Sequence, residues 1–303
     1  MPAQPSDGKT AGGQPAAKAE KTEVVEPLPK EDMKDLQAEL DSYIGLATVK
    51  EEVRNLINMA SVYKLRRQHD LPTTDMSLHM VFTGNPGTGK TMMARMMARI
   101  YRSLDILSKG QLVEVDRSGL VAGYVGQTAI KTQKVIQKAI GGVLFIDEAY
   151  ALNGKSENDF GQEAIDTILK AMEDHRDDLV VIVAGYTDLM DRFIHSNPGL
   201  ESRFNRFLLF EDYTPDEMLD IFKMQCKKGC YQLSDGVEEL VRDYITEENG
   251  DPETFGNARG VRNIFEHILV AQNNRLAAME TVTKEDLMTL TQDDVLHARG
   301  KLD

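Results

Sequence analysis

The chain has 303 residues, with 35 Lys and Arg against 49 Asp and Glu, giving a formal net charge of −14. Hydrophobic residues make up 41% of it, yet no apolar run approaches the ~20 residues that a membrane span requires. These values disfavour a transmembrane protein, and they disfavour general nucleic-acid binding because an acidic chain repels a polyanion.

The length suits a core domain plus a second, smaller one. The two cysteines, Cys226 and Cys230, are too few for a disulfide framework or a zinc site, so we expect them to be reduced packing residues. The N-terminus shows no signal-peptide pattern, which predicts a cytoplasmic protein.

Residues 1–29 hold five of the ten prolines and almost no large apolar side chains. Such a segment buries too little surface to offset its chain entropy, so we predict a disordered tail. From about Lys30 helical spacing begins, and a break at Ile44-Gly45-Leu46 separates a first helix from a second one. The apolar positions that predict these two helices are Met33, Leu36, Leu40 and Tyr43, followed by Val49, Val53, Leu56, Ile57 and Ala60.

An apolar strand ending at Phe82 leads into Gly84-Asn-Pro-Gly-Thr-Gly-Lys-Thr91, the pattern of a phosphate-binding loop. Glycines let backbone N–H groups turn around a phosphate, and the N-terminus of the following helix favours negative charge. Lys90 adds a cation, and the hydroxyl of Thr91 is placed to reach Mg²⁺. The alternative is a glycine-rich turn without a ligand, which the complete pattern after a strand disfavours.

Four further apolar runs predict strands, and helical stretches lie between them. The strands are expected at 112–116, 141–148, 179–184 and 207–210. The helices are expected at 91–103, from the end of a loop at 119–128 to about residue 139, and at 160–174. This alternation predicts an α/β domain over residues 30–211 with a doubly wound parallel sheet covered on both faces. In such sheets ligands bind at the carboxyl ends of the strands.

Near Asp212 the pattern changes to helices only, so residues 212–303 are expected to form a smaller helical domain. Thr214 and Glu217 predict a capping box with Pro215 at the first helical position. Gly229 is expected to end this helix. Helices are expected next at 237–247 and 258–278, and Thr283 with Asp286 opens a last one.

Asp147 and Glu148 follow a buried strand at the edge of the sheet where the phosphate loop lies. Phosphoryl transfer needs Mg²⁺ held in place and a water aligned with the γ-phosphate. We expect Asp147 to bind the Mg²⁺ shell with Thr91, and Glu148 to act as general base. The alternative is a pair of solvated carboxylates at a strand end.

These motifs resemble the AAA+ ATPases, which are P-loop NTPases with a helical C-terminal lid. The finer pattern is similar to the subfamily of stage V sporulation protein K and the red-type Rubisco activase CbbX, and to ATPases of type VII secretion. It covers about residues 40–300. The stretches that carry it are Gly-Tyr-Val-Gly-Gln-Thr at 123–128, the strand at 141–150, Val-Ala-Gly-Tyr at 183–186, 196–204, and Asn-Ala-Arg at 257–259.

The resemblance implies ATP and Mg²⁺ as cofactors and assigns roles to matching residues. Thr187 aligns with a polar sensor, although the family more often has Asn there, and Arg259 with a second sensor that touches the γ-phosphate. Arg262 is a weaker candidate for that second role. The residues expected to contact the nucleotide are Ile44, Gly45, Leu46, Asn85, Pro86, Gly87, Thr88, Gly89, Lys90, Thr91, Met92 and Arg259.

Arg203 matches the arginine finger, which reaches the site of a neighbouring subunit, and Arg206 is a second candidate. An arginine supplies planar positive charge to the developing phosphate charge. A surface ion pair is the alternative reading. If Arg203 is the finger, the protein is a homo-oligomer, and the resemblance implies a hexamer.

Tyr124, between Gly123 and Val125-Gly126, matches the pore-loop aromatic that grips a peptide in ring-shaped unfoldases. An aromatic ring on a mobile loop binds varied sequences through apolar contact, whereas a buried tyrosine before a helix is the alternative.

The leading hypothesis is a hexameric ATP-dependent remodeller that pulls a protein client through a central pore. A nucleotide-dependent assembly module that does not thread its partner is the runner-up. A DNA motor is disfavoured by the acidic composition, and the sequence does not identify the client.

Overall fold

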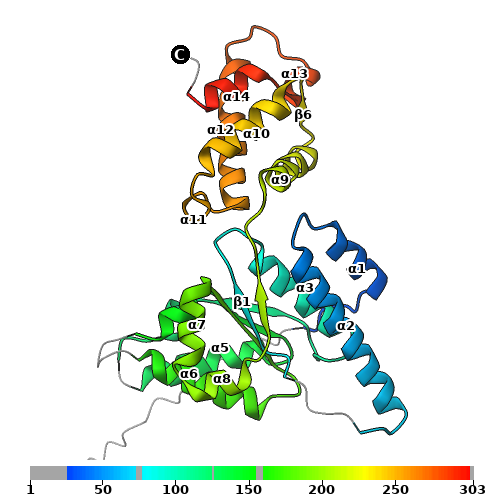
Figure 1. Cartoon of the computed structure of the whole chain (residues 1–303), viewed down its shortest axis with the longest axis vertical. Coiled ribbons are helices and arrows are strands. Elements are labelled where there is room, and N and C mark those ends of the chain that lie inside the picture. Colours follow the sequence, from blue (N-terminus) through cyan, green and yellow to red (C-terminus); the bar gives the residue numbers. More distant parts are fainter. Residues whose placement is uncertain (1–25, 73–76, 125, 155–159, 301–303) are drawn as a thin grey trace, which may run out of the picture.

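A computed structural model describes residues 26–72, 77–124, 126–154 and 160–300 of the chain. They form an α/β core with a helical domain beyond one end of its sheet (Figure 1). No helix in these ranges is both long and apolar enough to cross a membrane.

The core is built on five parallel strands in the order β2-β3-β4-β1-β5. Strands that follow one another in the sequence are joined by crossover connections, as the doubly wound prediction requires. Strands β1, β3 and β4 are buried along their whole length because helices cover both faces. The strands are β1 (Met80–Thr83), β2 (Leu112–Val115), β3 (Val143–Ile146), β4 (Val180–Gly185) and β5 (Phe207–Leu209).

Alternate residues of β1, β3 and β4 enter different hydrophobic cores, as the period of two demands. Phe82 and Phe145 belong to the core under α1, α2 and α3, whereas Val81 and Leu144 belong to the core under α5 to α8. The first group is α1 (Met33–Ser42), α2 (Ala47–Gln68) and α3 (Lys90–Ser103). The second is α4 (Arg117–Leu120), α5 (Gln127–Ala139), the 3-10 turn η1 (Ala149–Leu152), α6 (Gly161–Asp174), α7 (Thr187–His195) and α8 (Pro198–Arg203).

One prediction for the core needs correction. The tail expected over residues 1–29 lies outside the described residues only as far as residue 25. Leu28 is held on the core, because its N–H donates to the Lys109 carbonyl (2.8 Å) and its carbonyl accepts from Arg102 Nε (3.0 Å). Helix α8 begins at Pro198, with the Asn197 side chain accepting from the Gly199 N–H (2.7 Å).

A third hydrophobic core begins at Tyr213 and belongs to the lid. The capping box of Thr214 and Glu217 forms as predicted, and Gly229 follows the end of α9. The lid is helical, but the helix opened by Thr283 is not the last one, because α14 follows it. The short helix α11 and a two-residue parallel strand pair were not predicted. Its elements are α9 (Pro215–Lys228), β6 (Gln232–Leu233), α10 (Val237–Glu248), α11 (Pro252–Phe255), α12 (Ala258–Ala277), α13 (Lys284–Met288), β7 (Thr289–Leu290) and α14 (Gln292–Ala298).

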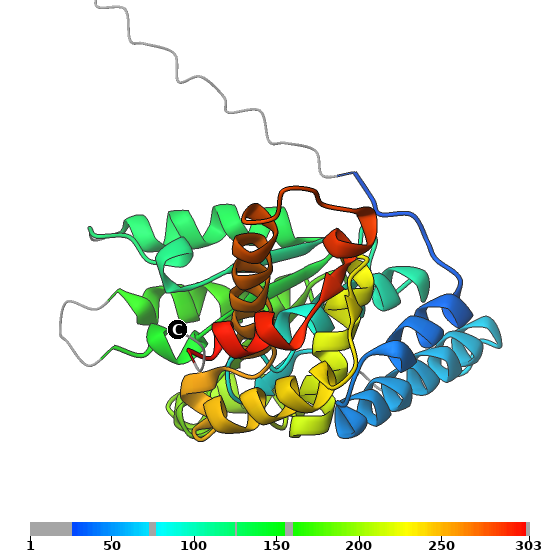
Figure 2. The ribbon, with the colours of Figure 1, turned by 90° about the horizontal axis from the view of Figure 1, so that it is seen from above.

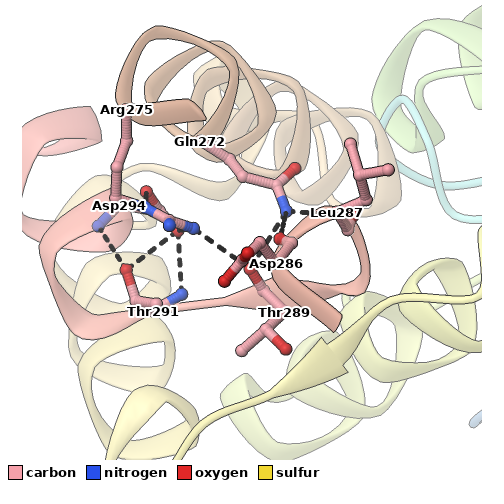
Figure 3. Close-up of polar contacts among 7 residues, drawn as sticks. All are labelled: Gln272, Arg275, Asp286, Leu287, Thr289, Thr291 and Asp294. Atoms are coloured by element: carbon pink, nitrogen blue, oxygen red, sulfur yellow. Dashed lines mark hydrogen bonds and ion pairs between the residues drawn. The ribbon is translucent and has the colours of Figure 1, made fainter. Parts of the chain in front are cut away.

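A polar cluster fastens the last lid elements to α12 (Figure 3). Arg275 Nε donates to Asp294 Oδ1 at 2.8 Å, and Asp294 also caps α14 through Thr291. Gln272 Nε2 donates to the carbonyls of Leu287 (3.2 Å) and Thr289 (3.0 Å). Because the Asp294 side chain is only 1% exposed, its charge depends on Arg275 for compensation.

We therefore expect Arg275→Met to lower the free energy of unfolding by about 3 kcal/mol, because it leaves a buried carboxylate without its cation. Urea denaturation followed by circular dichroism measures this, since the chain has no Trp. The matched control is Arg242→Met, which breaks an exposed lid ion pair with Asp216 and should cost under about 1 kcal/mol. Equal effects of the two changes would contradict the role given to Arg275.

Candidate functional site

The phosphate loop joins β1 to α3, and its glycines are required where it meets other backbone. Gly84 has φ 140°, and a Cβ there would lie 2.2 Å from the Phe210 carbonyl. Gly87 has φ 73°, and a Cβ there would lie 2.0 Å from the carbonyl of Gly256 in the lid. Only glycine permits these approaches, so the loop is pressed between the sheet and the lid.

Beside this loop lies a cleft of about 340 Å³ at the carboxyl ends of β1, β3 and β4. It brings together most of the residues predicted to bind nucleotide and metal. Lined by both backbone and charged side chains, it has the composition that a phosphate ligand needs. The lining residues are Gly84, Pro86, Gly87, Gly89, Lys90, Thr91, Met92, Asp147, Glu148, Gly185, Tyr186 and Arg259.

Lys90 is folded back onto the loop that it follows. Its Nζ donates to the carbonyls of Gly84 and Asn85, both at 2.7 Å. Burial lowers the pKa of Lys90 to about 8, and the nearby Asp147 and Asp212 partly oppose this shift. A bound phosphate would supply the negative charge that favours the ammonium form.

The two carboxylates follow β3 directly and line the cleft opposite Lys90. The Glu148 N–H donates to Asp147 Oδ1 at 3.0 Å. Glu148 has φ 48°, a left-handed conformation that is uncommon for a non-glycine residue. Such strain is found at functional sites where the surrounding structure holds it in place, which agrees with a role for Glu148.

Asn257 is a site residue that the sequence reading missed. It is 0% exposed, and its backbone has φ 53° and ψ −124°. Its Nδ2 donates to Asp212 Oδ1 (2.8 Å) and to the Pro86 carbonyl (3.3 Å), and its Oδ1 accepts from the Tyr213 N–H (2.9 Å). One side chain therefore joins the phosphate loop, the interdomain segment and the lid.

Asp212 completes this junction from the other side. Asn85 Nδ2 donates to both of its carboxylate oxygens, at 3.1 and 3.0 Å. The Ala258 N–H donates to the Gly87 carbonyl at 3.3 Å, which sets α12 against the loop. As a result Arg259, on the first turn of α12, lines the cleft.

Ile44, Gly45 and Leu46 lie behind the cleft, against Tyr213, and are not among its lining residues. Gly45 has φ 61°, and a Cβ there would lie 3.0 Å from the Tyr213 ring. Tyr213 Oη in turn donates to the Thr88 carbonyl at 3.3 Å. These contacts place the predicted base-binding stretch between the phosphate loop and the lid.

Several predicted residues lie away from the cleft. Thr187 is exposed at the start of α7, whereas its neighbour Tyr186 lines the cleft and packs near Tyr150, with ring centroids 6.1 Å apart. Arg262 is exposed and does not line the cleft. The sequence did not identify Tyr186 as a site residue, because a tyrosine after a strand is equally consistent with a packing role.

The two arginine candidates differ in how their own subunit holds them. Arg206 Nε donates to the Ser77 carbonyl at 3.0 Å, a well-formed contact. Arg203 makes only long contacts, to the Gly199 carbonyl (3.4 Å) and to Glu173 (3.6 Å). Within the described ranges its buried Nε has no hydrogen-bond partner, so its guanidinium is incompletely satisfied.

Tyr124 is 73% exposed on the loop between α4 and α5. Side chains added at Gly123 or Gly126 would meet nothing within 4 Å. Val125, the other residue predicted there, lies outside the described residues. The buried-tyrosine alternative is therefore wrong.

Two family models match the chain. One, the ATPase family associated with various cellular activities, matches residues 80–212, and an AAA lid domain matches residues 214–302. Two solved structures share the fold at low identity. The FIGL-1 AAA domain aligns at TM-score 0.59 and 18% identity over 86% of this chain and 82% of that one. The Thermotoga maritima RuvB branch migration motor aligns at 0.55 and 19% over 87% and 71%.

Similar curated proteins align over most of both chains. The chloroplastic ribulose bisphosphate carboxylase/oxygenase activase of Cyanidioschyzon merolae is 45% identical over 89% of this chain and 92% of its own length. Protein CbxX of Cupriavidus necator is 43% identical over 91% and 88%. Stage V sporulation protein K of Bacillus subtilis is 40% identical over 87% and 82%. The suspected subfamily is thereby confirmed.

The pKa of Lys90 predicts how nucleotide affinity depends on pH. Phosphate binding favours the ammonium form, so affinity should be highest and constant below pH 8. It should fall by up to about tenfold per unit as the pH rises above the free-state pKa of about 8. Titrating a fluorescent ATP analogue from pH 6.5 to 9.5 measures this. Lys90→Met should bind weakly without the alkaline decline, and the same decline in that variant would contradict the assignment.

The hydrogen bonds of Asn257 predict that its substitution uncouples the phosphate loop from the lid. Asn257→Ala removes three buried hydrogen bonds, one of them to a carboxylate, and should destabilise the junction by about 2–3 kcal/mol. Hydrogen exchange should then speed up at the start of α12, and ATPase activity should fall. Asn263→Ala, at an exposed position of the same helix, is the control, and unchanged exchange in Asn257→Ala would refute the coupling.

Proposed function

This chain belongs to the AAA+ ATPases and hydrolyses ATP, and we propose that it does so as a ring that pulls on a protein client. The ATPase activity follows from the family match over core and lid. The ring, the pulling step and the part of each residue below are the proposal.

The residues of the cleft fit a Mg²⁺-bound triphosphate. The loop N–H groups and Lys90 would hold the β- and γ-phosphates, since glycine at positions 84 and 87 keeps the backbone close. The Thr91 hydroxyl and Asp147 would hold the cation, which neutralises charge on the phosphates. Glu148, at the same cleft, would accept a proton from the attacking water.

The lid gives hydrolysis a mechanical output. Arg259 lines the cleft from α12, and Asn257 ties the same helix to the phosphate loop. Loss of the γ-phosphate would remove a partner of Arg259 and change the preferred angle of the lid. Thr187 stays a prediction as a sensor. Tyr186 is the better placed neighbour, because it lines the cleft.

The contacts of Arg203 support the proposal of a ring. Its own subunit leaves its Nε without a partner in the described ranges, and it lies outside the cleft. A neighbouring subunit's γ-phosphate would satisfy its guanidinium and receive positive charge in return. Six subunits remain the expected number, on the family resemblance alone.

The exposure of the Tyr124 side chain is the single observation on which the proposed pulling step depends. A large aromatic side chain exposed at 73%, on a loop with open space at both flanking glycines, has no packing role in its own subunit. Apolar contact with such a ring does not require a particular client sequence. The runner-up, an assembly module that binds a partner without threading it, would leave Tyr124 dispensable.

The names of the relatives suggest clients but do not choose among them. One relative is named as an activase of ribulose bisphosphate carboxylase/oxygenase and another as a sporulation protein. A cytoplasmic location likewise stays a prediction. Glu148→Gln should hold ATP without hydrolysing it and so retain the client, which a pull-down with ATP would identify.

Mixing two inactive variants tests the contribution of Arg203 in trans. Arg203→Ala and Lys90→Ala should each lose at least about a hundredfold in ATPase activity. Mixed at equal amounts they should recover about a quarter of wild-type activity, because a quarter of the sites then pair an intact Lys90 with a neighbour's intact Arg203. No recovery from properly assembled mixed rings would place Arg203 outside the neighbour's site. Arg206→Ala loses a contact within its own subunit. Mixing it with Lys90→Ala should therefore give no recovery of ATPase activity.

Substitution of Tyr124 separates pulling from simple binding. Tyr124→Ala should retain ATPase activity within about twofold and lose remodelling of the captured client, because the grip is lost and the cleft is untouched. Tyr124→Phe keeps the ring and should retain both activities. Full remodelling by Tyr124→Ala would favour the assembly module instead.

A further inference from the structure

One guanidinium on α3 holds two carboxylates from the N-terminal part of the chain. Arg99 donates from Nε and Nη2 to Glu31 (2.8 and 2.5 Å), and from Nη1 and Nη2 to Glu39 (2.8 and 2.7 Å). Both pairs are bidentate, a geometry that a planar guanidinium allows and an ammonium group does not. Hydrogen bonding to Arg99 lowers the pKa of both carboxyl groups. Arg99 therefore fastens α1, and the residues just before it, to α3 (Figure 1).

The same network reaches the residue that follows α1. Tyr43 Oη donates to Glu39 Oε1 at 3.0 Å. Burial and this hydrogen bond raise the pKa of Tyr43 to about 12, so the phenol remains a donor at neutral pH. On its other side, Lys50 Nζ donates to the carbonyls of Tyr43 and of Asp41 (3.2 Å for Asp41). Both the side chain and the backbone of Tyr43 are thus held in place.

Residues 44–46 follow Tyr43 directly and lie between the phosphate loop and the lid. Ile44 packs against the hydrophobic core of the lid, and Leu46 packs against both that core and the one under α1, α2 and α3. A Cβ added to Gly89 would lie 3.6 Å from Leu46 Cδ1 and 3.5 Å from Tyr213 Oη. Because Gly89 lines the cleft, these apolar side chains lie directly behind one end of it.

This arrangement suits the two ends of a nucleotide differently. The loop N–H groups and Lys90 suit phosphates, whereas the apolar side chains of residues 44–46 suit a flat base. Both ends depend on α3, because Lys90 begins this helix and Arg99 follows about two and a half turns later. A helix with fixed contacts at both places holds residues 44–46 at a set distance from the phosphate loop.

We propose that Arg99 is a positioning residue for the base of the bound nucleotide, because through Glu39 and Tyr43 it holds residues 44–46 where the base binds. This rests on the proposed nucleotide site and adds to it how affinity for the base is set. Without Arg99, the carboxylates of Glu31 and Glu39 would repel each other and move α1 away from α3.

Comparison of ATP with inorganic triphosphate tests the proposal, because triphosphate can occupy the phosphate loop but has no base. Isothermal titration calorimetry uses the full chain with Mg²⁺ and with Glu148→Gln, which should stop hydrolysis during the titration. Arg99→Met should weaken ATP binding about tenfold and triphosphate binding less than about twofold. In the chain with Glu148 intact, the KM for ATP should rise about tenfold while kcat changes less than about twofold.

Matched variants separate positioning from general damage. The control, Arg95→Met, breaks an exposed ion pair with Glu114 (3.8 Å) one turn earlier on α3 and should leave the affinity for both ligands unchanged. Arg99→Lys keeps the charge but loses the bidentate geometry, so its ATP affinity should fall between those of the wild type and Arg99→Met. Adding Glu31→Gln to Arg99→Met removes the repulsion between the carboxylates and should restore ATP affinity several-fold. Circular dichroism at the titration temperature checks that each variant is folded.

The outcomes separate this proposal from the site on which it rests. Equal weakening of ATP and triphosphate by Arg99→Met would mean that Arg99 supports the phosphate loop rather than the base, and unchanged affinity for both would overturn its role entirely. If the chain with Arg99 intact binds ATP no more tightly than triphosphate, residues 44–46 do not bind the base, and the ATPase activity stands. If neither ligand binds, the proposed nucleotide site itself is wrong.

Discussion

The contact between the phosphate loop and the lid is the constraint on which the site depends. Gly87 can approach the Gly256 carbonyl only because Gly87 has no side chain, and Asn257 occupies a fully buried position at the same junction. Its amide group satisfies Asp212, Pro86 and Tyr213 together. Because buried polar groups are costly when unpaired, moving the lid requires breaking or exchanging these hydrogen bonds.

In the proposed function, that junction would couple the bound nucleotide to the angle of the lid. The cleft takes its walls from both domains, with Lys90 and Glu148 from the core and Arg259 from the lid. Core and lid have separate hydrophobic interiors, so each can stay intact while the angle between them changes. In the proposed function, charge added or removed in the cleft would act on these few contacts between core and lid.

Two groups outside the cleft have few contacts within their own subunit. In the described ranges the Arg203 guanidinium is incompletely satisfied, and the Tyr124 side chain is 73% exposed. Figure 2 shows the core from above, with α1 and α2 on one side of the sheet and the helix layer that includes α5 and α6 on the other side. In the proposed ring, Arg203 would serve a neighbouring subunit and Tyr124 would contact the client.

Local pattern was enough to determine the core of this protein. Strands β1, β3 and β4 are continuous apolar runs, the phosphate loop has a fixed spacing, and Thr214 and Glu217 form a cap within four residues. Each of these depends on neighbours in sequence, so the sequence alone predicts it. The pairing of Asn257 with Pro86, of Arg275 with Asp294 and of β6 with β7 joins residues far apart in the chain or separated by whole helices. Such contacts have no local signature, and only the packing of the lid against the loop and against itself decided them.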